Sequence, residues 1–250
     1  MIGLGRHLLL IWGAIVVAGA GCERRTAGPS AATNTLPQAV ATATLPVGST
    51  PLPLSSGEES AQAEELVAAE QLAQEGRFTE AEIAYKSLVK KYPDNEEIYF
   101  NLAFLYGRTG QTNEAIANYE VALKLLPTYA EAHTNLGNLL VRLKRYDEAI
   151  AHLEAAVRAN PDNSRSYNNL GTALATAGRS TNAIPQFARA VQLDAAFPQA
   201  WFNLGISQLS AGRLEEGILA LETAVKLDPS LTPARAALDR AKQVRAARGY

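Results

Sequence analysis

The chain has 250 residues, of which 47% are hydrophobic and 19% are charged, with a formal net charge of −2. This balance is typical of one or two globular domains, and it excludes a collagenous or fully disordered protein. Lys and Arg number 23 against 25 Asp and Glu, so no positive excess is present to neutralise a phosphate backbone and we expect no nucleic-acid partner. One cysteine and three histidines are too few for a disulfide framework or a Cys/His zinc site.

Residues 1–21 have the layout of a secretory signal peptide. Arg6 and His7 precede an apolar run that begins at Leu8, and small residues lead from Ala18 to Cys22. The run reaches the cysteine after about 14 residues, short of the roughly 20 that a membrane-spanning helix needs. The segment therefore indicates export rather than a permanent transmembrane helix.

Two processing outcomes remain open at the end of this segment. Ala18 and Ala20 form an A-x-A cleavage site, which would release a soluble chain that begins at Gly21. Alternatively, the residues before Cys22 resemble the lipobox of bacterial lipoproteins, in which the cysteine becomes the lipidated first residue of the mature chain. Gly19 departs from that pattern, which usually has a branched aliphatic residue there. We favour lipidation, because an unpaired thiol is a liability in an oxidising compartment.

Residues 22–56 are expected to form a disordered tether. The 32 residues from Thr26 to Gly57 contain no charged or aromatic side chain and are rich in Ala, Thr and Pro. Such a composition cannot bury enough surface to offset its chain entropy. The tether would hold the following residues away from a membrane surface.

From Gln62 to Leu231 the sequence repeats five times with a period of 34 residues and no insertion. Positions four, seven, eight and eleven of each unit form one face of a first helix, and positions 20, 24 and 27 form one face of a second. Position eight is Ala69, Ala103, Gly137, Gly171 and Gly205, and position 20 is Ala81, Ala115, Ala149, Ala183 and Gly217. These small residues predict a helical hairpin whose two backbones approach closely.

The ends of the predicted helices also have sequence signals. Position 15 is glycine in four units and Lys144 in the third, which predicts a left-handed residue that ends the first helix. Position 18 offers expected N-caps for the second helix, namely Thr79, Asn113, Asp147 and Thr181. Residues 56–59 read as a capping box that starts the first helix near Gly57, and Thr232-Pro233 opens a basic last helix over 232–250. We interpret that helix as the polar cap of a solenoid, with contact to anionic lipid or an acidic partner as the alternative.

The spacing and the residues at these positions resemble tetratricopeptide repeats (TPR), and the chain as a whole resembles a bacterial TPR lipoprotein. The resemblance implies an all-α, right-handed α-solenoid of five helix-turn-helix units over 57–231, followed by the capping helix. It also implies a concave groove lined by the first helices.

Position six places one asparagine in each of the last four units: Asn101, Asn135, Asn169 and Asn203. A primary amide both donates and accepts hydrogen bonds, so such a column can pair with the backbone of an extended peptide. The column resembles the asparagine ladder of O-linked N-acetylglucosamine transferases. The alternative is that asparagine here is only the family's ordinary residue.

Further residues are predicted to line the peptide-binding groove. They are Phe100, Phe104, Asn138, Arg165, Phe202 and Ile206. Exposed apolar side chains are candidate anchors for a partner, unless the neighbouring unit covers them. The family's carboxylate-clamp pattern is not matched, because Arg165 is the only basic residue at position two.

No other motif indicates chemistry. The sequence contains no phosphate-binding loop, nucleophile elbow or pair of catalytic carboxylates, so we expect no enzyme, no cofactor and no metal. His133 is interpreted as a packed aromatic substitute, and His152 as an outward side chain without a partner at metal-ligand spacing.

These observations predict a non-enzymatic adaptor of the bacterial cell envelope, anchored through Cys22 on the extracytoplasmic side and binding an extended peptide segment of a protein partner. The alternative is a substrate-targeting subunit of an enzyme system, such as polysaccharide export or protein glycosylation. Architecture alone does not distinguish the two hypotheses.

Overall fold

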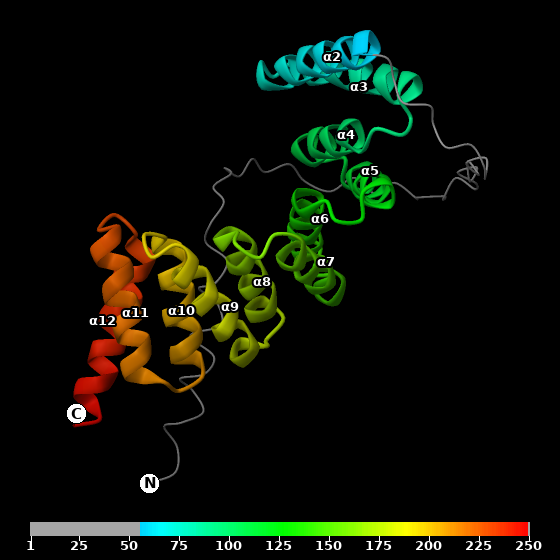
Figure 1. Cartoon of the computed structure of the whole chain (residues 1–250). Helices are drawn as coiled ribbons and strands as arrows, with labels where there is room; N and C mark the ends of the chain where they lie inside the picture. The colour runs from blue at the N-terminus through cyan, green and yellow to red at the C-terminus, as the bar shows by residue number, and fades with distance from the viewer. Residues whose placement is uncertain (1–55, 250) are drawn as a thin grey trace, which may run out of the picture.

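The computed structural model describes residues 56–249, which are all-α, and it confirms the predicted α-solenoid (Figure 1). The first helices of the five units are α2 (Ser56–Gln74), α4 (Glu96–Thr109), α6 (Ala130–Arg142), α8 (Ser164–Thr176) and α10 (Pro198–Ser210). The second helices are α3 (Phe78–Lys91), α5 (Thr112–Leu125), α7 (Tyr146–Ala159), α9 (Ser180–Leu193) and α11 (Leu214–Leu227), and α12 (Thr232–Ala247) follows the last unit. The predicted signal peptide and nearly all of the predicted tether lie outside the described residues.

The stack bends toward its first helices. Each first helix contacts the second helix of its own unit and also the first helix of the next unit, as in α4 with α6 and α6 with α8. Among the described helices, the second helices of successive units make no such contact with one another. First helices therefore lie on the inner side of the curve that Figure 1 shows running from α2 through α6 to α12.

Small residues at positions eight and 20 set the distance between the two helices of a unit. A Cβ atom on Gly137 would lie 2.6 Å from Cγ of Leu153, and a Cβ atom on Gly171 would lie 2.7 Å from Cε1 of Phe187. Ala149 at position 20 is completely buried. The close approach predicted from the sequence is therefore present.

A left-handed residue ends the first helix in every unit, as the spacing predicts. The glycines at position 15 have φ close to +80°, and Lys144 adopts φ +62° at the same place. The following residue donates its backbone N–H five residues back, as Arg77 does to the Leu72 carbonyl at 2.9 Å. This is the Schellman arrangement, which satisfies a carbonyl left free at the helix end.

The predicted N-caps of the second helices are wrong. Thr79, Asn113, Asp147 and Thr181 lie inside the helices, because each second helix begins at position 17. The N-cap falls at position 16, where no side chain makes a capping hydrogen bond. The Arg145 side chain at this position binds a side chain in the first turn of the helix instead: its guanidinium donates to both carboxylate oxygens of Glu148 at 2.7 and 2.6 Å.

The terminal helix α12 covers the last unit. Its apolar residues Ala234, Ala237, Leu238 and Ala241 share one buried cluster with Phe202 and Ile206 of α10. Part of its basic face pairs with α11, since Lys242 lies 2.8 Å from Glu222 and Arg245 lies 3.4 Å from Glu215. Within residues 56–249, no helix has the length and apolar character needed to cross a membrane.

Two glycine-to-alanine substitutions should change stability in opposite directions. Gly171→Ala should lower the free energy of unfolding by about 1–3 kcal/mol, because the new methyl group overlaps the buried Phe187 ring. Gly107→Ala in α4 should raise it by about 0.5–1 kcal/mol, because nothing lies within 4 Å of the new Cβ and alanine favours a helix. Urea unfolding followed by circular dichroism measures both, and stabilisation by Gly171→Ala would contradict the close helix crossing.

Candidate functional site

The asparagine column lies on the first helices, but two of its four amides are already engaged. The Asn101 amide donates to Oε1 of Glu70 at 2.8 Å. The Asn203 amide is 9% exposed, donates to Oδ1 of Asn168 at 2.9 Å and accepts from Nε2 of Gln199 at 3.2 Å. These amides join neighbouring units, so their capacity to bind a peptide is reduced.

The two middle amides differ from the outer ones. Asn135 and Asn169 are half-buried on the adjacent helices α6 and α8. The Asn135 side chain forms a hydrogen bond with the buried Tyr119 hydroxyl. Burial raises the pKa of Tyr119, and the bond to Asn135 offsets part of that increase. Among residues 56–249, no partner forms a hydrogen bond with the Asn169 side chain. The column therefore presents two adjacent amides with unused donors or acceptors.

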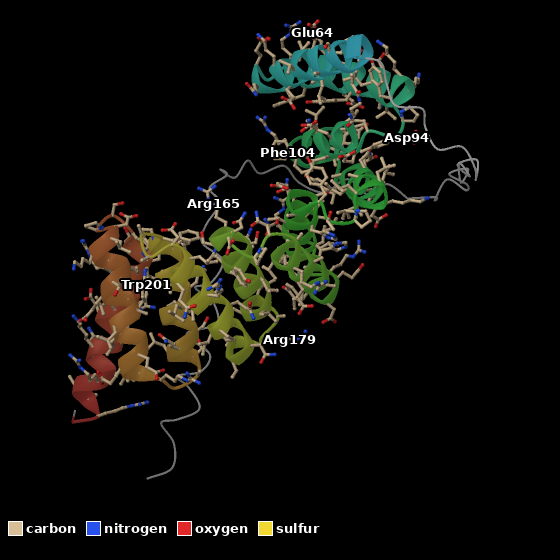
Figure 2. The ribbon with its side chains drawn as sticks, in the orientation of Figure 1. Glu64, Asp94, Phe104, Arg165, Arg179 and Trp201 are labelled. Carbon is tan, nitrogen blue, oxygen red and sulfur yellow. The ribbon has the colours of Figure 1, made fainter. Side chains whose placement is uncertain are left out.

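Aromatic side chains flank these amides on α4. The Phe100 ring packs against Tyr129 with ring centroids 4.9 Å apart and against Tyr119 at 5.9 Å. Phe104, one turn further along the helix, is 48% exposed. Figure 2 shows Phe104 and Arg165 on the inner side of the bend, whereas Arg179 lies on the outer side. Of the two predicted phenylalanine anchors on α4, only Phe104 is available to a partner.

The exposure predicted for Phe202 and Ile206 is not found. Phe202 is 4% exposed and Ile206 is 2% exposed, because α12 packs over them. The sequence analysis allowed for cover by a neighbouring unit, and the cover comes instead from the helix α12 that follows the last unit. Phe202 and Ile206 are therefore not available as anchors for a partner.

Charge is unevenly distributed along the inner face. The pKa of Glu97 is raised by burial first and then by the nearby charges of Glu70 and Glu96. Burial, and after it the charges of Glu97 and Glu131, raise the pKa of Tyr129 to about 12. Arg165 is exposed at the start of α8, and Asn138 is half-buried on α6. The N-terminal part of this face is thus acidic, and its middle is polar.

Two histidines that the sequence analysis treated separately lie together. Nδ1 of His133 on α6 is 3.0 Å from Nδ1 of His152 on α7. The pKa of His152 is lowered by burial and then by His133. Positions four and 23 of a unit face each other across its two helices. The repeat positions of the two histidines could therefore have indicated their contact. No group of three or more potential metal ligands occurs within residues 56–249.

Comparisons with known proteins agree with this architecture. The tetratricopeptide repeat family matches residues 63–105, 100–164, 134–199 and 168–232 of the chain. No curated protein matches it.

Solved structures share the fold. MamA from Desulfovibrio magneticus RS-1, residues 41 to the end, is 22% identical with a TM-score of 0.62, over 68% of this chain and 96% of that chain. YrrB, described as a TPR protein with an unusual peptide-binding site, is 22% identical with a TM-score of 0.62, over 72% and 94%. TTC0263, a thermophilic TPR protein in Thermus thermophilus, is 23% identical with a TM-score of 0.54, over 73% and 99%.

The family matches run from residue 63 to residue 232 and span the five hairpins seen in the structure. The fold is one that serves protein–protein interaction in general. The chain belongs to the tetratricopeptide repeat family.

Proposed function

We propose that this protein is a non-catalytic adaptor of the bacterial cell envelope that binds an extended segment of a protein partner along its inner face. The observation that carries the proposal is the pair of adjacent amides, Asn135 and Asn169, together with the half-exposed ring of Phe104 on the inner side of the bend. The amides supply hydrogen bonds to a peptide backbone, and the ring supplies an apolar contact.

The dimensions of this face suit a short peptide. Packed helices lie about 8–10 Å apart, so α4 to α8 spans two intervals, or roughly 20 Å. An extended chain rises about 3.3 Å per residue, so about six residues cover that distance. The charges of Glu70 and Glu97 would favour a basic side chain at the N-terminal end of this face. Burial, and after it the nearby charges of Glu70 and Glu96, raise the pKa of Glu97, and a bound cation would offset both effects.

Placement in the envelope rests on the sequence alone, because Cys22 lies outside the described residues. The support is the apolar segment that ends at the only cysteine of the chain. A substrate-targeting subunit of an enzyme system would use the same groove and would differ in the identity of its partner. Recovery of a transferase or export enzyme on the groove would favour that alternative.

The first test removes the two available amides. The double variant Asn135→Ala and Asn169→Ala should bind a peptide selected by display against the full chain about five- to a hundredfold more weakly, because each lost hydrogen bond costs about 0.5–1.5 kcal/mol. Isothermal titration calorimetry measures the affinity, and circular dichroism checks the helices. The matched control replaces the exposed Asn113 and Asn182 of second helices and should leave affinity unchanged. Equal affinity of the two double variants would place recognition elsewhere.

The second test concerns the apolar anchor. Phe104→Ala should weaken binding of the same peptide by about tenfold or more, because a buried aromatic anchor contributes about 2 kcal/mol or more to an interface. Leu219→Ala is the control, since Leu219 is 63% exposed on the second helix α11 and should not affect binding. An equal loss in both variants would argue against a groove-specific contact.

The third test concerns the lipid anchor. Cys22→Ser should move the protein from the membrane fraction to the soluble fraction of the bacterial host, because lipidation requires the thiol. Mass spectrometry of the unchanged protein should find a lipid-modified N-terminal cysteine. A mature chain that begins at Gly21 would show ordinary cleavage after Ala20 instead, and would overturn the lipid anchor while leaving the groove proposal intact.

A further inference from the structure

The third unit contains a histidine pair that the other four units lack. His133 and His152 occupy positions four and 23, their ring centroids are 5.2 Å apart, and their Nδ1 atoms are 3.0 Å apart. The corresponding pairs in the other units are Glu65 with Ala84, Tyr99 with Asn118, Tyr167 with Gln186, and Trp201 with Ala220. Packing of the hairpin therefore does not require two imidazoles here.

The hydrogen bond made by Nε2 of His133 fixes which ring nitrogen carries the hydrogen. Its Nε2 lies 3.1 Å from the carbonyl oxygen of Pro127, which can only accept, so Nε2 carries the hydrogen. In the neutral ring, the lone pair is then on Nδ1, and Nδ1 faces His152. Metal-binding histidines are oriented in the same way, with one nitrogen donating to a backbone carbonyl and the other free to coordinate.

We propose that His133 and His152 bind a divalent transition-metal ion of the class that prefers imidazole, such as Cu²⁺, Ni²⁺ or Zn²⁺, through their Nδ1 atoms. At metal–nitrogen distances of about 2.0–2.1 Å, two neighbouring ligands are about 2.8–3.0 Å apart at right angles and about 3.3–3.4 Å apart at a tetrahedral angle. The observed 3.0 Å separation falls within this range. Without metal, Nδ1–H of His152 donates to the Nδ1 lone pair of His133. An ion would take the place of this hydrogen, with His152 carrying its hydrogen on Nε2 instead, and small rotations of the two rings would then turn both Nδ1 lone pairs toward the ion.

The site supplies two protein ligands and leaves the remaining coordination positions of the ion to water or to a side chain of a partner protein. No third ligand lies beside the pair among the described residues, and the nearby Glu148 carboxylate is held by Arg145. Both histidines are only partly buried, so an ion can reach them from solvent. Affinity should therefore be modest, in the micromolar range rather than that of a structural zinc site.

A bound ion would join the two helices of the central unit. His133 is on α6, two residues before Asn135, and His152 is on α7. An ion that binds only the folded hairpin would stabilise it by mass action. This consequence does not depend on what the groove binds.

The test titrates Cu²⁺ alone into the full chain without an affinity tag, with calorimetry for affinity and electron paramagnetic resonance for nitrogen coordination. We expect one site that weakens at least tenfold in either His133→Gln or His152→Gln. Cu²⁺ should also raise the melting temperature of the unchanged protein and slow hydrogen exchange in α6 and α7, but it should do neither in these variants.

Two controls separate this site from other ligands. In the chain that keeps residues 1–21, His7→Gln replaces the third histidine and Cys22→Ser replaces the only thiol, and both variants should keep the site. Melting without metal checks that His133→Gln and His152→Gln remain folded. If the variant that lacks both His133 and His152 binds Cu²⁺ as tightly as the unchanged protein, or if His7→Gln or Cys22→Ser alone removes the binding, the proposal is wrong.

Discussion

The near contact of two helix backbones within each unit is the constraint on which the rest of the structure depends. At Gly137 and Gly171 there is no room for even a methyl group, and a completely buried alanine faces each crossing from the second helix. This spacing fixes the shape of the hairpin, and repetition of one hairpin shape produces a regular stack. Because first helices touch from unit to unit and second helices do not, the stack bends and acquires an inner face.

The fold could be predicted because its determinants recur at fixed positions 34 residues apart. The N-caps could not be predicted from side-chain preference alone, because the backbone decides where the second helix begins. The residue after the left-handed position completes the Schellman turn of the first helix, as in Arg77 to Leu72 and Arg179 to Leu174, and is at once the N-cap of the next helix. The N-cap residue is therefore Arg or Gln, whose side chain makes no capping hydrogen bond in any unit.

The candidate site was predictable only as far as the repeat determines which face a residue occupies. All four asparagines lie on the first helices, yet their surroundings differ. Glu70 engages Asn101 from 31 residues away, and Asn168 engages Asn203 from 35 residues away. Both partners belong to the preceding unit and occupy positions that differ from unit to unit. The identity of such neighbours is tertiary information, as is the contact between His133 and His152.

Residues that differ from unit to unit make the two ends of the inner face chemically different. Identical units would present a uniform surface, whereas this face begins with clustered glutamates and the exposed Phe104 and continues with the amides of Asn135 and Asn169. At the other end, α12 buries Phe202 and Ile206, and Asn203 is engaged within the stack. The packing of α12 that caps the solenoid therefore also removes these two side chains from solvent. For the proposed peptide, this means an exposed apolar side chain at Phe104 on α4 and none at Phe202 or Ile206 on α10, so the helix that stabilises the C-terminus would also limit how far such a partner could extend.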